Sequence, residues 1–163
     1  MSKYVHILHN FINDEDCLAL INHLKYLEDN KKLINKGDGR LCAINKKDLI
    51  FKKMVDKYYL KIRNQFNDEY QNIFGYILTV YNKGVGMAPH TDAEEGEEVG
   101  ALFYLNDDYL GGELIIDTPD ETFIHKPQKG DLIYFPSWFK HSVSTVTQGT
   151  RYFFTISLTN KTI

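Results

Sequence analysis

Two residues that could hold a metal ion stand close together in the middle of the chain. His90 and Asp92 are separated by a single threonine in the segment His90-Thr91-Asp92. If this segment is extended, both side chains point to the same face of a sheet, because successive side chains of a strand alternate. An imidazole and a carboxylate in this arrangement can bind one metal ion from one side. The alternative interpretation is an ordinary surface hydrogen bond.

A third metal ligand would have to come from another strand. His141 begins a β-rich run and is a candidate for that position. Two histidines and one carboxylate form the facial triad of non-haem Fe(II) oxygenases, which leaves coordination positions open on the metal. His90, Asp92 and His141 are therefore the candidate metal ligands, and they are the candidate catalytic residues for the same reason.

Arg151 follows His141 by ten residues, beyond a turn expected at 147–149. In a hairpin, Arg151 would pair near Thr145, which lies four residues or roughly 13 Å along the strand from His141. A small dicarboxylate and an arginine side chain together span that gap. Because a guanidinium can hold a carboxylate bidentately, Arg151 suits an anchor for the far end of such an acid. A salt bridge at the edge of a barrel is the alternative.

The elements that must position these residues fall into two parts. Asn13, as an N-cap, and apolar residues at helical spacing predict a helix over 14–29, and a second helix begins near Asp48. Short strands are expected at 4–8 and 40–44. After residue 71 the pattern becomes β-rich, with runs at 76–81, 99–105, 113–116, 122–125, 131–135, 141–146 and 151–158.

This order of helices followed by many short strands favours an α+β fold with a sandwich or barrel. We expect one domain over 1–163, with helical support over 1–72 and a β core over 73–160, since 163 residues correspond to a single domain. No apolar run approaches the roughly 18 residues of a membrane span. Cys17 and Cys42 are too few for a disulfide framework, which makes a reducing cytoplasm the expected compartment.

Charge is unevenly distributed along the chain. Residues 31–63 carry 11 basic and 3 acidic side chains, whereas residues 92–98 hold five acidic groups and no basic one. The basic stretch is either an anion-binding face, for example for nucleic acid, or a solvated surface. The acidic loop is either a lid that attracts a basic peptide or a solubilising loop. An acidic loop near the metal would repel a phosphate backbone, which argues against nucleic acid as substrate.

A series of motifs in the second half of the chain resembles a known family. In chain order these motifs are YNKGVGMAPHTD (81–92), FYLND (103–107), GGELII (111–116), PQKGDLIYF (127–135), HSVSTV (141–146) and GTRY (149–152). The series resembles the Fe(II)- and 2-oxoglutarate-dependent dioxygenases, and within them the prolyl 4-hydroxylase-like branch. The resemblance is continuous over about 74–159, and more loosely it includes the N-terminal segment HNFINDEDCLALI.

The resemblance implies a double-stranded β-helix (jelly-roll) with the metal at its open mouth, and it implies roles by position. His90, Asp92 and His141 match the iron ligands. Arg151 matches the residue that pairs with the C5 carboxylate of 2-oxoglutarate, where many collagen-type prolyl hydroxylases have lysine instead. Tyr104 and Tyr81 match tyrosines that contact or line the cosubstrate pocket, and ordinary core packing is the alternative for both. The implied cofactors are Fe(II), 2-oxoglutarate and O2, with ascorbate as a candidate additional reductant.

The implied activity is hydroxylation of a prolyl residue in a peptide or protein, with release of succinate and CO2. A hydroxylase of free proline or another small molecule is an alternative, because substrate specificity lies in loops rather than in the barrel. Nucleic-acid oxidative demethylases typically have a second arginine six residues after the first, and Ser157 stands there in this chain. A catalytically silent jelly-roll binding module is the remaining alternative. No membrane partner is expected, and the sequence does not indicate an oligomeric state.

Overall fold

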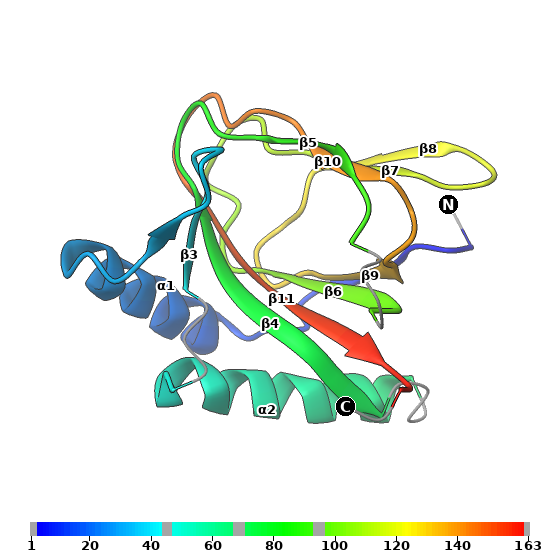
Figure 1. The fold of residues 1–163 in the computed structure, drawn as a ribbon, viewed down its shortest axis with the longest axis horizontal. Coiled ribbons are helices and arrows are strands. Elements are labelled where there is room, and N and C mark those ends of the chain that lie inside the picture. The colour runs from blue at the N-terminus through cyan, green and yellow to red at the C-terminus, as the bar shows by residue number, and fades with distance from the viewer. Residues whose placement is uncertain (1–2, 44–46, 67–70, 93–96, 162–163) are drawn as a thin grey trace.

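Two antiparallel sheets and two helices make up the protein in the computed structural model, which describes residues 3–43, 47–66, 71–92 and 97–161 (Figure 1). The larger sheet has seven strands in the order β1-β9-β6-β11-β4-β3-β2. Its strands are β1 (His6–Leu8), β2 (Ile34–Asn35), β3 (Leu41–Ala43), β4 (Asn72–Tyr81), β6 (Val99–Tyr104), β9 (Leu132–Pro136) and β11 (Arg151–Thr159).

The smaller sheet has four strands in the order β5-β10-β7-β8. Its strands are β5 (Met87–His90), β7 (Leu114–Asp117), β8 (Thr122–His125) and β10 (His141–Val143). Strands from the second half of the chain thus pass back and forth between two sheets that face each other (Figure 1). This is the α+β double-stranded β-helix, or jelly-roll, that the sequence predicts.

The two helices, α1 (Asp14–Asp29) and α2 (Leu49–Gln65), lie against the outer face of the larger sheet (Figure 1). α1 begins at its predicted N-cap, and α2 begins next to Asp48, as predicted. The Asn13 side chain accepts a hydrogen bond from the backbone N–H of Asp16 at 2.8 Å, and Asp48 caps α2 by accepting from the N–H groups of Ile50 and Phe51. Such caps satisfy N–H groups that have no partner within the helix. Both helix predictions are confirmed.

Alternation along the central strands creates two hydrophobic cores. On β6, Phe103 faces the helices and stacks on Phe154 of β11 with ring centroids 4.3 Å apart, whereas Leu102 faces the smaller sheet. The second core lies between the sheets and includes Leu114 and Val143. The aromatic residues of the chain concentrate in these cores, and the space between the sheets is where the candidate site lies.

The structure overturns the predicted hairpin between His141 and Arg151. β10 and β11 belong to different sheets, and Arg151 pairs with Tyr81 of β4 rather than near Thr145. The predicted run 141–146 ends as a strand at Val143, after which the chain crosses to the larger sheet. Periodicity identified both strands but could not show that the turn between them changes sheets.

Three short strands from the first part of the chain extend the larger sheet. β1 and β3 confirm the strands expected near 4–8 and 40–44, and the two-residue β2 was not predicted. β3 pairs with β4 through Leu41↔Val80, which brings the residue before it, Arg40, to the edge of the space between the sheets. Both cysteines are buried and free. Neither of the two helices described is long and apolar enough to cross a membrane.

Candidate metal centre

The three predicted metal ligands come together at one end of the smaller sheet. His90 is the last residue of β5, and His141 is the first residue of β10. They are direct partners in the antiparallel register, with ring centroids 4.3 Å apart. Asp92 lies just beyond β5, where its backbone N–H donates to the carbonyl of Ser137 at 3.1 Å. Asp92 therefore lies two residues beyond the end of the strand, and its place beside His90 is fixed by this backbone hydrogen bond rather than by strand pairing.

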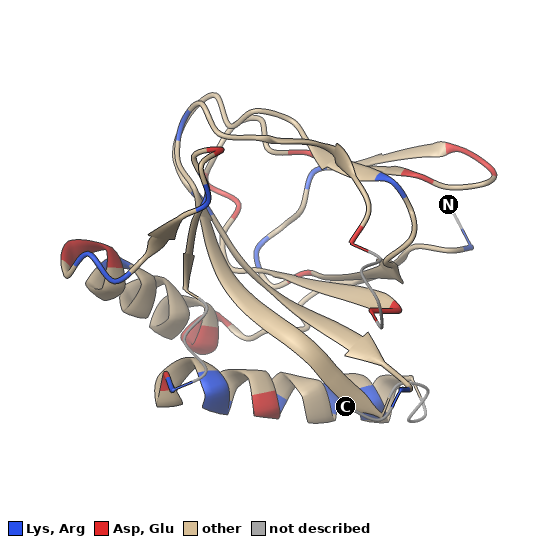
Figure 2. Ribbon diagram, viewed as in Figure 1, with Lys and Arg blue, Asp and Glu red and all other residues tan. Residues whose placement is uncertain are grey.

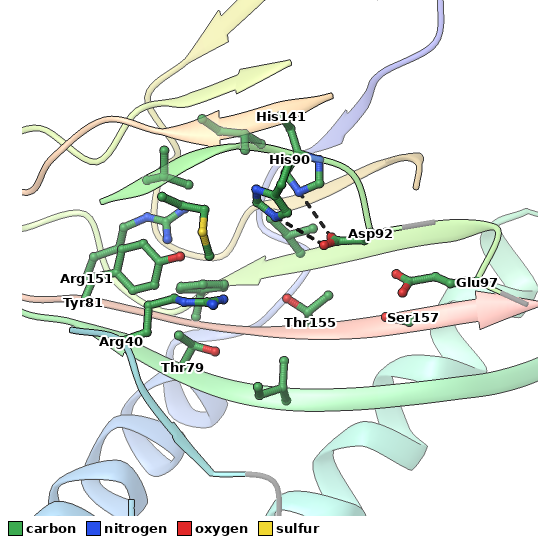
Figure 3. A pocket seen from close by; sticks show the side chains of 16 residues that line it. Arg40, Thr79, Tyr81, His90, Asp92, Glu97, His141, Arg151, Thr155 and Ser157 are labelled. Atoms are coloured by element: carbon green, nitrogen blue, oxygen red, sulfur yellow. Dashed lines mark ion pairs between the residues drawn. The ribbon is translucent and has the colours of Figure 1, made fainter. Parts of the chain in front are cut away.

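The carboxylate of Asp92 nevertheless reaches back between the two rings. Its Oδ1 lies 3.2 Å from Nε2 of His90, and its Oδ2 lies 3.2 Å from Nε2 of His141 (Figure 3). One potential ligand atom from each of the three residues lies within 4.8 Å of the others. The side chain of Asp92 is 37% exposed and that of His141 only 6%, so the cluster opens to solvent on the aspartate side.

Backbone carbonyls fix the orientation of both rings. Nδ1 of His90 faces the carbonyl of Ala88 at 2.8 Å, and Nδ1 of His141 faces that of Phe139 at 2.9 Å. Because a carbonyl oxygen only accepts, Nδ1 carries a hydrogen, so Nε2 is the atom that faces the carboxylate: it donates to Asp92 when the ring is protonated and offers its lone pair to a metal when the ring is neutral. Both Nε2 atoms point to the same place as the carboxylate.

The electrostatics keep Asp92 ionised. Burial would raise the pKa of the Asp92 carboxyl group, but hydrogen bonds from His141 and His90 outweigh burial and hold the pKa well below its usual range. The pKa of His90 is raised, chiefly by the same hydrogen bond to Asp92. Two imidazoles and one carboxylate that converge on one point suit a divalent iron ion. The donor set therefore fits the metal that the resemblance implies.

Arg151 lies in the same cavity as these three residues, and it is completely buried (Figure 3). Its Nη2 donates to the hydroxyl of Tyr104 at 3.1 Å. Its Nε and Nη1 have no hydrogen-bond partner within the described part of the chain. Its neighbours are instead aromatic rings, with the guanidinium 4.2 Å from the ring centre of Phe153 and 5.0 Å from that of Tyr81.

A buried cation without an acidic partner is costly, because desolvation is compensated only by an opposite charge and full hydrogen bonding. None of the ion pairs between described residues includes Arg151. The free nitrogens of this guanidinium therefore suit an anion from outside the chain, and a carboxylate matches their planar geometry. The residues present thus fit a 2-oxoglutarate carboxylate.

The cavity that joins the two features has a volume of about 190 Å³ and lies between the sheets. Tyr81 and Arg151 line one end, and the three candidate ligands line the wall formed by the smaller sheet and the loop after β5 (Figure 3). Tyr104 does not line the cavity. It is fully buried behind Arg151, and it reaches the site through its bond to the guanidinium. The structure thus brings all six predicted site residues together.

Sequence reasoning missed two charged residues of the cavity. Arg40 extends into it from the hairpin of β2 and β3, and its Nε donates to Asp38 at 2.8 Å (Figure 3). Glu97 lies at the opposite side and contacts Ser137 through a 3.3 Å hydrogen bond. Burial, reinforced by the charge of Asp92, raises the pKa of Glu97 to about 7. Most of the acidic loop around Glu97, residues 93–96, lies outside the described residues.

Comparison with known proteins agrees with this geometry. Residues 76–158 match the model of the 2OG-Fe(II) oxygenase superfamily. A PKHD-type hydroxylase of Xylella fastidiosa (strain M12) is 36% identical over 139 residues, which cover 82% of this chain and 59% of the relative. The chain therefore spans less than two thirds of the length of this curated relative and of others that it matches.

Solved structures share the fold. A Pseudomonas putida prolyl-4-hydroxylase has a TM-score of 0.80 at 18% identity, with 98% of this chain and 95% of that chain covered. A prolyl hydroxylase from Trichoplax adhaerens, solved with a peptide fragment of the hypoxia inducible factor oxygen degradation domain, has a TM-score of 0.78 at 19% identity. That match covers 98% of this chain and 84% of the other. At these identities the likeness establishes the jelly-roll architecture.

Proposed function

The chain belongs to the 2OG-Fe(II) oxygenase superfamily, and from that premise we propose that it is an Fe(II)- and 2-oxoglutarate-dependent dioxygenase. Its proposed reaction is hydroxylation of a prolyl residue in a peptide or protein, with release of succinate and CO2. The observation that carries the proposal is a single cavity with a His-Asp-His cluster on one wall and a buried, incompletely bonded arginine at one end.

Each residue of the cavity has a definite task in this proposal. His90, Asp92 and His141 hold Fe(II), and Arg151 with Tyr104 holds the C5 carboxylate of 2-oxoglutarate. When bound, Fe(II) and 2-oxoglutarate activate O2 for insertion of one oxygen atom into a C–H bond. The carbonyls of Ala88 and Phe139 keep the imidazole rings in the ligating orientation.

The remaining walls of the cavity control what else enters. Apolar side chains from both sheets surround the cluster and exclude water, which suppresses side reactions of an oxidising centre. They are Leu102, Leu114, Val143 and Phe153. Tyr81 lies opposite Arg151 in the register and in this proposal forms the side wall of the cosubstrate pocket.

Support for a prolyl substrate comes from the names of the similar proteins, since the Pseudomonas and Trichoplax structures are both prolyl hydroxylases and the latter holds a peptide. Free proline or another small molecule is the second candidate substrate. Hydroxylation by this chain, its substrate and the cytoplasmic location expected from its cysteines all stay predictions.

The charge distribution gives no support to a nucleic-acid substrate. Basic side chains of the 31–63 stretch are spread over the β2–β3 hairpin and α2, with a few acidic ones among them (Figure 2). Several of them are already paired, Arg40 with Asp38, Lys52 with Asp56 and Lys57 with Asp16. The interpretation of this stretch as a mixed, solvated surface therefore has the stronger support.

A mass-spectrometric screen tests the proposal. Purified protein, Fe(II), 2-oxoglutarate and ascorbate are incubated with proline-containing peptides and with free proline, and succinate is measured in parallel. We expect a mass gain of one oxygen atom on a peptide, dependent on 2-oxoglutarate and absent with the Asp92→Ala variant. A mass gain on free proline alone would show that the substrate is the free amino acid and not a peptide. Absence of both products, together with absence of Fe(II) binding, would favour the silent binding module.

A further inference from the structure

Tyr109 is a buried residue to which neither the motif pattern nor the resemblance assigns a role. It lies in the segment between β6 and β7, five residues after Tyr104, and is 3% exposed. Its hydroxyl has no hydrogen-bond partner in the described parts of the chain. A buried hydroxyl normally has a partner, and leaving one unsatisfied costs roughly 1–3 kcal/mol.

Packing around Gly112 places the Tyr109 ring beside Arg151. A Cβ atom built on Gly112, whose φ is +70°, would lie 2.9 Å from Cε2 of Tyr109 and 3.1 Å from Cδ of Arg151. The ring and the arginine side chain therefore meet over the same glycine, and a larger residue at this position would force both of them to shift. The motif GGELII thus contains a glycine that is required for this close approach.

A lysine holds the ring in place from another direction. The ammonium group of Lys126 lies 3.5 Å from the centre of the Tyr109 ring. The same group donates to the backbone carbonyls of Tyr109, at 3.1 Å, and Gly111. With the ring and its backbone both fixed, the position of the hydroxyl is determined by packing rather than by a hydrogen bond of its own.

The hydroxyl lies within the electrostatic reach of the guanidinium. Burial raises the pKa of Tyr109, and the positive charge of Arg151 and a hydrogen-bonding interaction with its side chain act against that rise. The Tyr109 hydroxyl and the Nε and Nη1 groups of Arg151 thus form a group of three adjacent buried donors, none of which has an acceptor within hydrogen-bond distance among the described residues. A carboxylate has two oxygens with about four acceptor positions and can satisfy all three donors.

We propose that Tyr109 donates a hydrogen bond to the distal carboxylate of the cosubstrate, alongside Arg151 and Tyr104. This inference rests on the proposed function, because it takes 2-oxoglutarate as the diacid. The cavity ends at Arg151, and the hydroxyls of Tyr104 and Tyr109 both lie beside its guanidinium. The distal carboxylate site is therefore a cation between two phenols, and Tyr109 is a binding residue that selects for a second carboxylate.

The substitution Tyr109→Phe tests this proposal because it removes only the hydroxyl. Binding of 2-oxoglutarate is measured by calorimetry on Fe(II)-loaded protein without oxygen. Pyruvate, which lacks the distal carboxylate, is the matched probe. We expect the dissociation constant of 2-oxoglutarate to rise roughly tenfold and that of pyruvate to stay the same, since a hydrogen bond to a charged group is lost only with the diacid.

The stability of the metal-free protein gives a second readout. Loss of an unpartnered hydroxyl leaves the midpoint of urea unfolding unchanged or raises it. Tyr58→Phe is the control, because the Tyr58 hydroxyl donates to Asp16 far from the cavity. We expect Tyr58→Phe to lower the unfolding midpoint and to leave the affinity for 2-oxoglutarate unchanged, which is the opposite result in both measurements.

Two results would overturn the role of Tyr109 while keeping the proposed function. These are unchanged 2-oxoglutarate affinity in Tyr109→Phe, or an equal loss of affinity for 2-oxoglutarate and pyruvate, which would indicate ring packing alone. If the wild-type protein itself binds Fe(II) but no 2-oxoglutarate, the proposed function fails and the inference fails with it. The wild-type titration thus separates the two failures.

Discussion

Two arginines line the same cavity under opposite physical conditions. Arg151 is completely buried, has no acidic partner among the described residues and leaves two of its nitrogens without hydrogen bonds. Arg40, at the mouth, has a side chain that is 28% exposed and is already paired with Asp38. A buried cation retains nearly all of its electrostatic strength, whereas an exposed pair is screened by water.

This contrast indicates that different parts of the cavity bind different molecules. The end near Arg151 is rigid, aromatic and short of acceptors, which suits one defined anion. Arg40 lies on the Arg151 side of the cavity, at its edge, whereas Glu97 lies on the opposite side, and both are partly exposed (Figure 3). The candidate metal ligands lie between Arg151 and Glu97, so a diacid bound at Arg151 and a substrate that enters on the Glu97 side would approach the metal from different sides.

The largest effect is expected at the metal cluster. Asp92→Ala removes the anionic member of the candidate ligand set and leaves two histidines. We expect Fe(II) binding to weaken strongly and 2-oxoglutarate turnover, measured as succinate, to fall by at least about a hundredfold. Asp38→Ala is the control. It removes a carboxylate that accepts hydrogen bonds from the backbone N–H and the Nε of Arg40 and is not part of the candidate ligand set. Full turnover by Asp92→Ala would show that the ligand assignment is wrong.

The second-largest effect is expected on the free energy of unfolding when Arg151 is replaced. Arg151→Met replaces a buried, incompletely bonded cation by an apolar side chain, a change that often stabilises a protein by about 1–4 kcal/mol. We expect the free energy of unfolding of the ligand-free protein to rise by about 1–2 kcal/mol. 2-Oxoglutarate should no longer raise the melting temperature of this variant.

Arg40→Met is the comparison for this experiment and should change the unfolding free energy by less than about 0.5 kcal/mol. Denaturant unfolding of both variants measures the difference. If Arg151→Met instead proves less stable than the wild type, the bond to Tyr104 and the ring contacts outweigh desolvation, and the contrast between the arginines disappears.

A smaller effect on stability is expected from the titration of Glu97. The pKa of Glu97 is raised from 4.5 to about 7, mainly by burial. A raised carboxyl pKa favours the folded state at low pH, and this contribution is lost as pH rises from about 4.5 through 7. Relative to the metal-free wild type, Glu97→Gln should therefore gain stability over this range, by about 1 kcal/mol.

Glu113 provides a control of opposite sign for the pH experiment. Its pKa is lowered, chiefly by a hydrogen bond from Ser144. Glu113→Gln should therefore be less stable than the wild type at neutral pH, and the difference should vanish as pH falls below the ordinary glutamate pKa. Unfolding curves at several pH values measure both variants. Parallel curves for Glu97→Gln and the wild type would show that Glu97 is solvated.

The smallest effect is expected for the affinity of Arg40→Gln. Because this guanidinium is paired and partly exposed, 2-oxoglutarate should bind to the variant within about threefold of the wild type. Calorimetry on Fe(II)-loaded protein provides the value. A loss as large as that expected for Arg151 variants would mean that the two arginines share one anion, and the contrast between them would have to be abandoned.

Local signals in the sequence predicted the parts of the fold that depend on local physics. Asn13 marked the start of α1 because a cap acts within three residues. The types and order of His90, Asp92 and His141 identified candidate metal ligands that the fold brings together. The hairpin predicted for Arg151 was wrong, because the choice between two sheets depends on long-range pairing that no periodicity records.

Arg40 and Tyr109 show the same limit at the level of the site. Arg40 reaches the cavity only because β3 adds to β4 at the sheet edge, and a three-residue strand contains no information about its partner. Tyr109 looks like any core aromatic residue in the sequence. Its unpartnered hydroxyl becomes visible only when Gly112 brings the ring and Arg151 together.

The central claim is that Arg151 is the anchor for the cosubstrate and that the metal cluster functions independently of it. Its most direct test is a titration of 2-oxoglutarate into Fe(II)-loaded protein without oxygen, with the wild type and Arg151→Gln side by side. We expect affinity for 2-oxoglutarate to fall by about a hundredfold or more in the variant, since a buried charge pair is lost, while the affinity for Fe(II) stays the same. Equal binding of 2-oxoglutarate by the two proteins would contradict the account.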